Sequence, residues 1–230
     1  MKEWLKRRVT AAGYEITRGS TLHSFLNSRY IDLVVDAGAN IGQFGQAIRL
    51  RGYGGRIWSF EPVSKVYAAL ASAAARDPNW TTSRLALGSA TGTAEINVFD
   101  NHTLASILPG TRLAESYDGG GVTTRETISV ETVDIALRDD PARHIMLKVD
   151  VQGYEREVLE GAKETLSRID AIHIELPVEH LYEGNWSFTE AIAYMEDLGF
   201  APAQFRTVNS LPDDPASAVE FDCLFRRRGA

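Results

Sequence analysis

Short apolar runs alternate with segments of helical periodicity along most of the chain, in an order that indicates the fold class. The runs have the length and composition of buried strands, and the helical segments end at glycine or at Asp-Pro. A strand–helix–strand order of this kind builds parallel βαβ units, so the pattern predicts one α/β sheet with helices on both faces. The expected strands cover residues 32–36, 56–60, 83–87, 145–150 and 171–176. The expected helices cover residues 42–51, 63–75 and 188–198.

Five further segments complete the expected architecture. Residues 93–100 alternate like a strand, whereas residues 101–126 are polar and Gly-rich without core periodicity, so we expect a mobile loop there. Residues 200–208 and 218–226 are expected to form two antiparallel strands joined by a Pro/Asp loop. After the turn at Gly153, one face of an amphipathic helix is expected to carry Val158, Leu159, Ala162 and Leu166.

The size and charge of the chain narrow the classes of protein. A length of 230 residues, with 44% hydrophobic and 24% charged residues, suits one globular domain. We expect a helical cap at residues 1–30 and a single domain at residues 31–230. The net charge of −7 argues against a nucleic-acid-binding face, which would concentrate Lys and Arg. The substrate is therefore expected to be neither a nucleic acid nor another polyanion.

The cysteine content and the N-terminal residues indicate the cellular compartment in which the protein is expected. The single cysteine, Cys223, leaves no intrachain disulfide and no Cys-rich metal framework, so we expect it to pack in the core. The basic N-terminal residues are not followed by an apolar segment, and no stretch approaches the length of a transmembrane span. These features predict a cytoplasmic protein. They leave the oligomeric state open, a homodimer included.

The segment from Asp36 to Gly42, Asp-Ala-Gly-Ala-Asn-Ile-Gly, lies where an expected strand turns into a helix. Open α/β sheets bind ligands at this carboxyl edge. Gly38 can adopt backbone angles closed to other residues, and Gly42 lets the start of the helix approach a ligand. A merely tight turn explains the same glycine spacing equally well.

Glu61 favours the ligand-binding interpretation. It ends the next expected strand, where a carboxylate can accept hydrogen bonds from both hydroxyls of an adenosine ribose. An NAD(P)-dependent oxidoreductase could use the same acid. However, Asn40 occupies the place of the middle glycine in the dinucleotide pattern G-x-G-x-x-G, which leaves less room for a pyrophosphate. A Rossmann-fold oxidoreductase is therefore the runner-up, and a non-catalytic cofactor-binding module is a third alternative.

Two motifs resemble those of a known enzyme family. Val35 to Gly42, together with Phe60-Glu61-Pro62, resembles the class I S-adenosylmethionine-dependent methyltransferases, and Lys148 to Glu155 resembles their FkbM family. Residues 158–162 and 174–176 match the FkbM pattern in the same order. The resemblance implies a Rossmann-like, seven-stranded, mostly parallel sheet with one antiparallel strand. It also implies that S-adenosylmethionine is the cofactor.

The resemblance further implies a substrate class and a set of cofactor-binding residues. FkbM proteins are mostly O-methyltransferases of sugars or natural products, so a small-molecule or glycan acceptor is expected. Glu61, with Pro62, would hold the ribose, while Leu87 and Gly88 would approach the adenine. The residues expected at the amino-acid end of the cofactor are Asp36, Gly38, Ala39, Asn40 and Gly42.

Methyl transfer to an alcohol requires a group that removes the hydroxyl proton. Asp150 and Glu175 end neighbouring expected strands, so either can be the base, or both can hold a divalent metal such as Mg²⁺. For Asp150 the alternative is a helix cap. His173 shares the face of Glu175 by the period-two rule, and its alternative is a buried, hydrogen-bonded histidine.

Two loops are candidates for the acceptor pocket. His102 and Ser106 follow the strand that ends near residue 100, and His180 and Tyr182 follow Pro177. In the second loop, Trp186 is expected either to stack on a sugar or to close the edge of the core.

Overall fold

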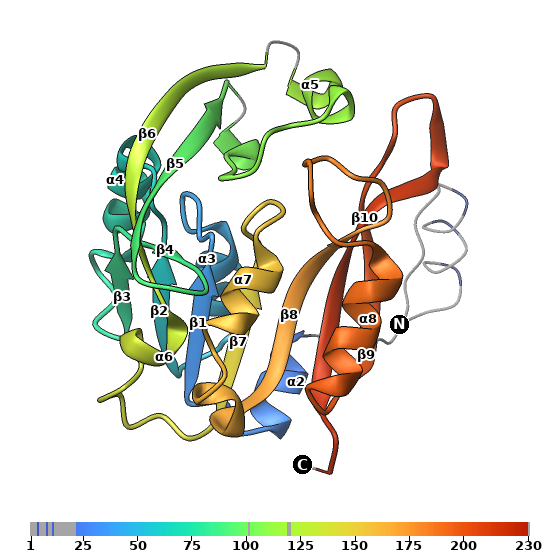
Figure 1. Cartoon of the computed structure of the whole chain (residues 1–230). Coiled ribbons are helices and arrows are strands. Elements are labelled where there is room, and N and C mark those ends of the chain that lie inside the picture. Colours follow the sequence, from blue (N-terminus) through green and yellow to red (C-terminus); the bar gives the residue numbers. More distant parts are fainter. Residues whose placement is uncertain are drawn as a thin grey trace.

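A seven-stranded sheet forms the centre of the molecule in the computed structural model, which describes residues 4, 8, 11, 22–100, 102–118 and 121–229 (Figure 1). Its strand order is β3-β2-β1-β7-β8-β10-β9. The first five strands are parallel, and only β10 runs against its neighbours β8 and β9. The bounds are β1 Leu33–Ala37, β2 Arg56–Phe60, β3 Trp80–Ser83, β7 Ile145–Val149, β8 Ile169–Pro177, β9 Phe200–Leu211 and β10 Asp214–Arg227.

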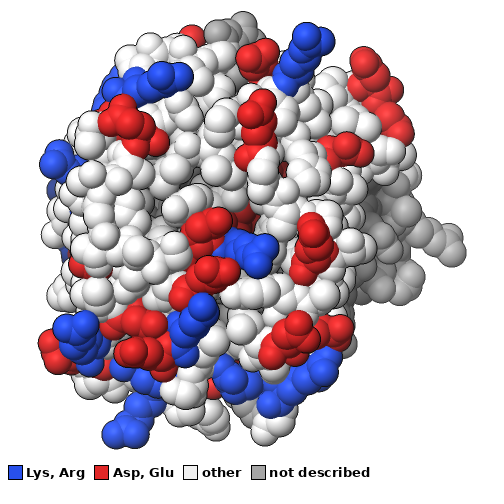
Figure 2. All heavy atoms as spheres, viewed as in Figure 1, with Lys and Arg blue, Asp and Glu red and all other residues white. Residues whose placement is uncertain are grey.

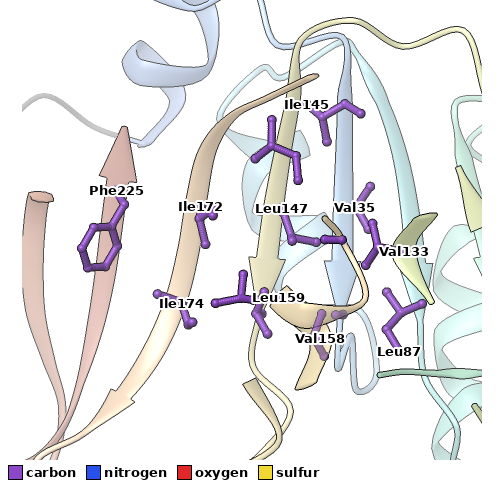
Figure 3. Packing of buried hydrophobic residues seen from close by; sticks show 14 of the residues in the cluster. Val35, Leu87, Val133, Ile145, Leu147, Val158, Leu159, Ile172, Ile174 and Phe225 are labelled. Atoms are coloured by element: carbon purple, nitrogen blue, oxygen red, sulfur yellow. The ribbon is translucent and has the colours of Figure 1, made fainter. Parts of the chain in front are cut away.

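Helices cover both faces of this sheet because successive residues of a buried strand point to opposite sides. Val34 and its neighbours across the sheet pack against α2 Leu22–Ser28, α3 Gln43–Leu50 and α4 Ser64–Ala74. Val35 and Leu147 face the other side, where they pack against α6 Val133–Ala136, α7 Glu155–Glu160 and α8 Phe188–Asp197 (Figure 3). The expected α/β sheet with helices on both faces is confirmed.

A smaller, three-stranded sheet rises above the carboxyl edge of the main sheet (Figure 1). It pairs β4 with β6 in parallel and β5 with β6 antiparallel. Val63 and Val66, at the start of α4, pack against its apolar face. The elements of this region are β4 Ala86–Leu87, β5 Gly92–Phe99, the 3-10 helix η1 His102–Leu104, α5 Arg112–Asp118 and β6 Val122–Glu131.

Two sequence predictions in this region are wrong. The strand expected at 83–87 divides between the sheets, because β3 pairs with β2 only over Trp80–Ser83 while Ala86–Leu87 pairs with β6. Residues 101–126, expected as one loop, contain η1, α5 and the start of β6. Residues 122–127 of β6 are mostly exposed and held by backbone pairing with β5, so they carry no apolar alternation that the sequence could reveal.

The remaining elements lie close to the predicted ones. β9 and β10 form the expected antiparallel hairpin with its turn at Pro212 and Asp213. The helix expected after Gly153 is shorter, because α7 ends at Glu160 and a separate 3-10 helix, η2, follows at Thr165–Arg168. Most of the N-terminal cap expected at residues 1–30 lies outside the described residues. No helix in the described part is long and apolar enough to span a membrane.

The packing of α3 on the sheet yields a stability prediction. A Cβ added at Gly45 would lie 2.2 Å from the buried ring of Trp80. Overpacking of this kind costs about 1–3 kcal/mol, against a gain of up to about 1 kcal/mol in helix propensity. We expect Gly45→Ala to lower the free energy of unfolding by about 1–2 kcal/mol, measured by urea denaturation.

Gly54 provides the matched control, because a Cβ added there meets no atom within 4 Å. Gly54→Ala should change the free energy of unfolding by less than about 0.5 kcal/mol. Equal effects of the two substitutions would contradict the proposed packing of α3 on Trp80.

Candidate functional site

A cavity of about 730 Å³ opens at the carboxyl edge of the main sheet, between this sheet and the smaller one. This volume falls in the range of about 300–1,000 Å³ that is usual for small-molecule sites. Side chains from α3, β8, β9 and β10 and from the segment after η1 complete its wall. The expected site residues that line it are Gly38, Ala39, Asn40, Glu61, Pro62, Leu87, Asp150, His173 and Glu175.

The turn after β1 requires a glycine at position 38. This residue has a φ of 73°, and a Cβ there would lie 1.8 Å from the carbonyl oxygen of Asp150. The turn after β1 therefore touches the turn after β7, and no side chain fits between them. Asn40 is also left-handed, with a φ of 50°, which Asn tolerates better than most residues. Both residues line the cavity.

Glu61 is held at the end of β2 by backbone donors. Its Oε2 accepts from the N–H of Asn40 at 3.0 Å, and its Oε1 accepts from the N–H of Val63 at 2.9 Å. Burial raises the pKa of Glu61 to about 7, and the two N–H donors oppose this shift only in part. A carboxyl group is thus presented to the cavity beside the Gly38 turn, with its orientation fixed.

An ammonium group lies between two carboxylates at the floor of the site. Lys148 Nζ is 3.2 Å from Asp36 Oδ1 and 3.3 Å from Asp150 Oδ2, and it donates to the carbonyl oxygen of Gly38 at 3.5 Å. Burial alone would lower the pKa of Lys148, but the adjacent Asp150 and Asp36 carboxylates raise it above its ordinary value. Lys148 therefore stays charged and joins the ends of β1 and β7.

Gln152 connects Asp150 to Glu175. Its Nε2 donates to Asp150 Oδ1 at 3.0 Å and to Glu175 Oε2 at 2.8 Å. The hydroxyl of Tyr182 donates to Gln152 Oε1 at 2.7 Å, and that bond orients the amide with its NH₂ toward the two carboxyl groups. The hydroxyl of Ser106 donates to the backbone oxygen of Gln152 at 2.5 Å.

The two linked carboxyl groups differ in protonation. Burial alone would raise the pKa of Asp150, but the Lys148 ammonium and the Gln152 amide hold it below its ordinary value. Burial and the neighbouring Asp150 charge raise the pKa of Glu175 well above its ordinary value. Asp150 is therefore an ionised acceptor whose side chain is 35% exposed, while Glu175 is a neutral acid. Burial lowers the pKa of His173, so its ring, 5.6 Å from the ring of Phe44, is neutral.

Three expected cofactor residues are not among the described residues that line the cavity. Asp36 is fully buried and pairs with Lys148 beneath the floor. Gly42 is the N-cap of α3 with a φ of 90°, a left-handed conformation that favours glycine, and it faces Leu70 and Trp80. Gly88 packs between Val130 and Tyr154.

The expected acceptor-pocket residues occupy other places. Ser106 and Tyr182 are buried behind the wall and support Gln152, while His180 is exposed. The side chain of His102 lies outside the described part. Trp186 is 7% exposed and packs edge-on against Tyr194, so it closes the core instead of offering a stacking face.

Two site residues were missed by the sequence analysis, although both belong to the Lys148 to Glu155 motif. Lys148 carries no signal by itself, because a lysine in a strand is usually exposed. Gln152 is the third residue after β7, with a φ of 56°. That left-handed conformation turns the Gln152 side chain back over Asp150. No sequence pattern predicts this conformation.

The expected magnesium site finds no support. Among the described residues, no three His, Cys, Asp or Glu side chains gather closely enough to hold a metal ion. Asp150 already has the Lys148 ammonium as its cation, and Glu175 is a neutral acid. This donor set does not suit a divalent ion, which prefers ionised oxygen ligands.

A comparison with protein families now identifies the chain. A family model described as the methyltransferase FkbM domain matches residues 36–202. The chain belongs to the FkbM methyltransferase family. It is an S-adenosylmethionine-dependent methyltransferase, which sets the oxidoreductase alternative aside. No curated protein matches the chain.

Two solved structures are similar to this FkbM methyltransferase at low sequence identity. TehB from Haemophilus influenzae is similar with a TM-score of 0.51 and 10% identity, over 96% of this chain and 65% of TehB. Magnesium protoporphyrin IX methyltransferase from Synechocystis PCC 6803, solved with bound S-adenosylmethionine, has a TM-score of 0.49 and 11% identity, over 98% and 92% of the chains. The Rossmann-like class I methyltransferase fold, with one antiparallel strand among seven, is thus confirmed.

The position of Lys148 in this FkbM protein gives a second stability prediction. Lys148→Met leaves Asp36 and Asp150 without their shared cation in a buried site. Breaking a buried ion pair in this way costs about 3–5 kcal/mol, and the partial exposure of Asp150 places the expected loss near the lower value. The free energy of unfolding from urea denaturation is the measurement.

The control is Arg228→Gln, which breaks the exposed Arg228–Glu196 ion pair at the surface. Exposed pairs contribute about 0–1 kcal/mol, so the control should remain close to the wild type. A Lys148→Met protein as stable as the control would show that the buried ion pairs do not hold the site together.

Proposed function

We propose that this protein transfers the methyl group of S-adenosylmethionine to a hydroxyl of a sugar or glycosylated natural product. The observation that carries the proposal is the ionised carboxylate of Asp150, fixed by Lys148 and Gln152 and directed into the cavity beside the Gly38 turn. An alcohol needs a positioned proton acceptor, and Asp150 is suited to be one. The family resemblance supports the choice of a sugar as acceptor.

The cavity residues fit S-adenosylmethionine. Gly38 and Asn40 line the cavity where the amino-acid end is expected, and the oriented carboxyl of Glu61 suits the ribose hydroxyls. Leu87 and Pro62 offer apolar surface for the adenine side. When bound, S-adenosylmethionine supplies a methyl group on a positively charged sulfonium.

Asp150 acts on the acceptor in this proposal. The acceptor hydroxyl donates a hydrogen bond to an Asp150 oxygen, and its proton passes to that carboxylate as the oxygen gains the methyl group. Because the pKa of Asp150 is low, the carboxylate is ionised throughout the physiological range. A weak base of this kind orients the hydroxyl first and takes its proton late.

The charge distribution supports a small, non-polyanionic acceptor. On the face shown in Figure 2, Lys and Arg side chains are interspersed with Asp and Glu, and the described residues drawn there form no continuous basic surface. The net charge of −7 is in keeping with this. Nucleic-acid binding normally relies on clustered Lys and Arg.

The direct test is an acceptor screen. The protein is incubated with methyl-labelled S-adenosylmethionine and a panel of sugar nucleotides, glycosides and total RNA, and products are identified by mass and NMR. We expect label on a sugar oxygen. Label on nitrogen, on carbon or on RNA would overturn the proposal.

The raised pKa of Glu61 predicts pH-dependent cofactor affinity. The ionised carboxylate is the form that accepts hydroxyl hydrogen bonds, and it is lost as the pH falls through the Glu61 pKa of about 7. The Kd for S-adenosylmethionine, measured by calorimetry, should rise by up to about tenfold from about pH 8 to about pH 6. Glu61→Gln should bind weakly at both pH values, and an unchanged pH dependence in this variant would exclude Glu61 as its origin.

Replacement of Asp150 tests the proton acceptor. Asp150→Asn should lower kcat by about 10²–10⁴-fold, because a positioned base is removed, and leave the Kd for S-adenosylmethionine within about twofold. The exposed Asp139 supplies the control, and Asp139→Asn should retain wild-type kcat. Unchanged turnover in Asp150→Asn would refute its role, and inactivity of the wild type on every acceptor would favour the non-catalytic module.

Metal dependence is tested with a chelator. Since Asp150 has Lys148 as its cation and Glu175 is neutral, we expect EDTA to leave product formation within about 20% of the untreated rate. Loss of activity with EDTA and its recovery with Mg²⁺ would restore the metal hypothesis.

A further inference from the structure

A row of polar residues continues from the proposed cofactor site to the far edge of the sheet. Strand pairing places Glu175 opposite Asp222, and Asp222 opposite Arg206. All three line the cavity, together with Gln204 and Asn209 of β9. The antiparallel hairpin therefore supplies one wall of the cavity, although the sequence analysis assigned no site residue to it.

The length of this wall leaves room beyond the cofactor. Glu61, Gly38 and Asp150 follow the adjacent strands β2, β1 and β7, and the cofactor is proposed to lie across these three. From β7 to β9 the row crosses three more strand spacings of about 4.8 Å, or about 14 Å in all. This part of the cavity begins where Asp150 presents its carboxylate.

The wall offers donors and acceptors, of which the Arg206 side chain is 78% exposed. Arg206 pairs with Asp222, whose side chain is 17% exposed, and Asn209 Nδ2 donates to Glu220 Oε2 at 2.7 Å. Asp222 can accept a hydrogen bond and Arg206 can donate several, because each uses only part of its capacity in their mutual contact. Hydroxyl groups, which both donate and accept, match such a mixed surface.

The charges of the cavity balance one another. Burial lowers the pKa of His173 and raises that of Glu175, so both face the cavity uncharged. An anionic group on the acceptor would be repelled by the Asp150 and Asp222 carboxylates, and a cationic group would be repelled by Arg206. The other charged or acidic residues that line the cavity are Arg51, Glu61 and Lys148.

We propose that Asp222, Arg206 and Gln204 bind an uncharged, polyhydroxylated part of the acceptor and turn its reacting hydroxyl toward Asp150. This inference rests on the proposed O-methyl transfer and narrows it to neutral sugars at the hairpin wall. Leu224 and Val208 supply apolar surface between the polar groups, as the mixed surface of a sugar ring requires.

The test uses simple sugar probes and the protein of residues 1–230. Binding of the methyl glycosides of glucose, galactose and mannose, and of methyl glucuronide, is measured by saturation-transfer NMR with S-adenosylhomocysteine present. We expect a neutral glycoside to bind, and its Kd to rise by about tenfold or more in Asp222→Asn and in Arg206→Gln, because each loses a charge-assisted hydrogen bond. The glucuronide should bind at least about fivefold more weakly than the corresponding glucoside.

Controls separate this proposal from the proposed function. Arg228→Gln removes another exposed arginine from an ion pair away from the cavity and should leave glycoside binding unchanged. Calorimetry should give the same Kd for S-adenosylhomocysteine in the wild type and all variants, and thermal melting should show that Asp222→Asn is folded.

Three results would overturn the hairpin subsite: no neutral glycoside binds, both wall variants bind it like the wild type, or the glucuronide binds equally well. Failure of the wild type to bind S-adenosylhomocysteine would instead contradict the proposed function, because the hairpin wall does not form the proposed cofactor site.

Discussion

The site depends on the ion pairs that the ammonium group of Lys148 forms with two carboxylates. The ammonium group lies in low dielectric between the carboxylates of Asp36 and Asp150, where a charge is stable only when it is paired. By joining the ends of β1 and β7, it holds the Gly38 turn against Asp150, the proposed proton acceptor. The close approach at Gly38, which excludes any side chain, follows from the same junction. The Lys148 ammonium therefore positions both the Gly38 turn, which lines the proposed cofactor site, and Asp150, the proposed proton acceptor.

Burial then divides the carboxyl groups into two kinds. Asp150 stays ionised because Lys148 and Gln152 stabilise its charge, whereas Glu175 lacks a cation of its own and is held neutral. Burial likewise raises the pKa of Glu155 to about 8, although its Oε1 accepts from the N–H groups of Val151 and Gly153. Asp150 therefore gives the reacting hydroxyl one defined proton acceptor, because the pKa values of the neighbouring Glu175 and Glu155 are raised while that of Asp150 is lowered.

The smaller sheet contributes to the site through Gln152. Ser106, which follows η1, donates to the Gln152 backbone oxygen, and the Tyr182 hydroxyl, which donates to the Gln152 amide oxygen, lies 3.2 Å from the carbonyl oxygen of Leu104. Gln152 is therefore hydrogen-bonded to the segment after η1, through Ser106, and to the loop after β8, through Tyr182. The carboxyl pair and the layer that covers the cavity are coupled through one side chain, a physical reason for a glutamine with a strained backbone at this position.

The sequence by itself determined the parallel half of the sheet and the motifs at its edge. Runs such as Leu33–Ala37 are continuous and buried on both faces, so their apolar signal is strong, and Asp150 and Glu175 were found because strand ends meet at one edge. Tertiary structure alone decided the rest. The roles of Lys148 and Gln152 depend on which strands are neighbours and on one left-handed residue, which are not written in local periodicity.

The hairpin and the smaller sheet show the same limit. Asp222 and Arg206 meet only through the register of β10 with β9, which contains several irregularities that sequence alternation cannot predict. Residues 122–127 of β6 are held by backbone pairing with β5 and are mostly exposed, so this part of the strand has no apolar alternation. Sequence carries the hydrophobic contribution of each element, whereas the pairing of polar groups from distant strands exists only after the chain has folded.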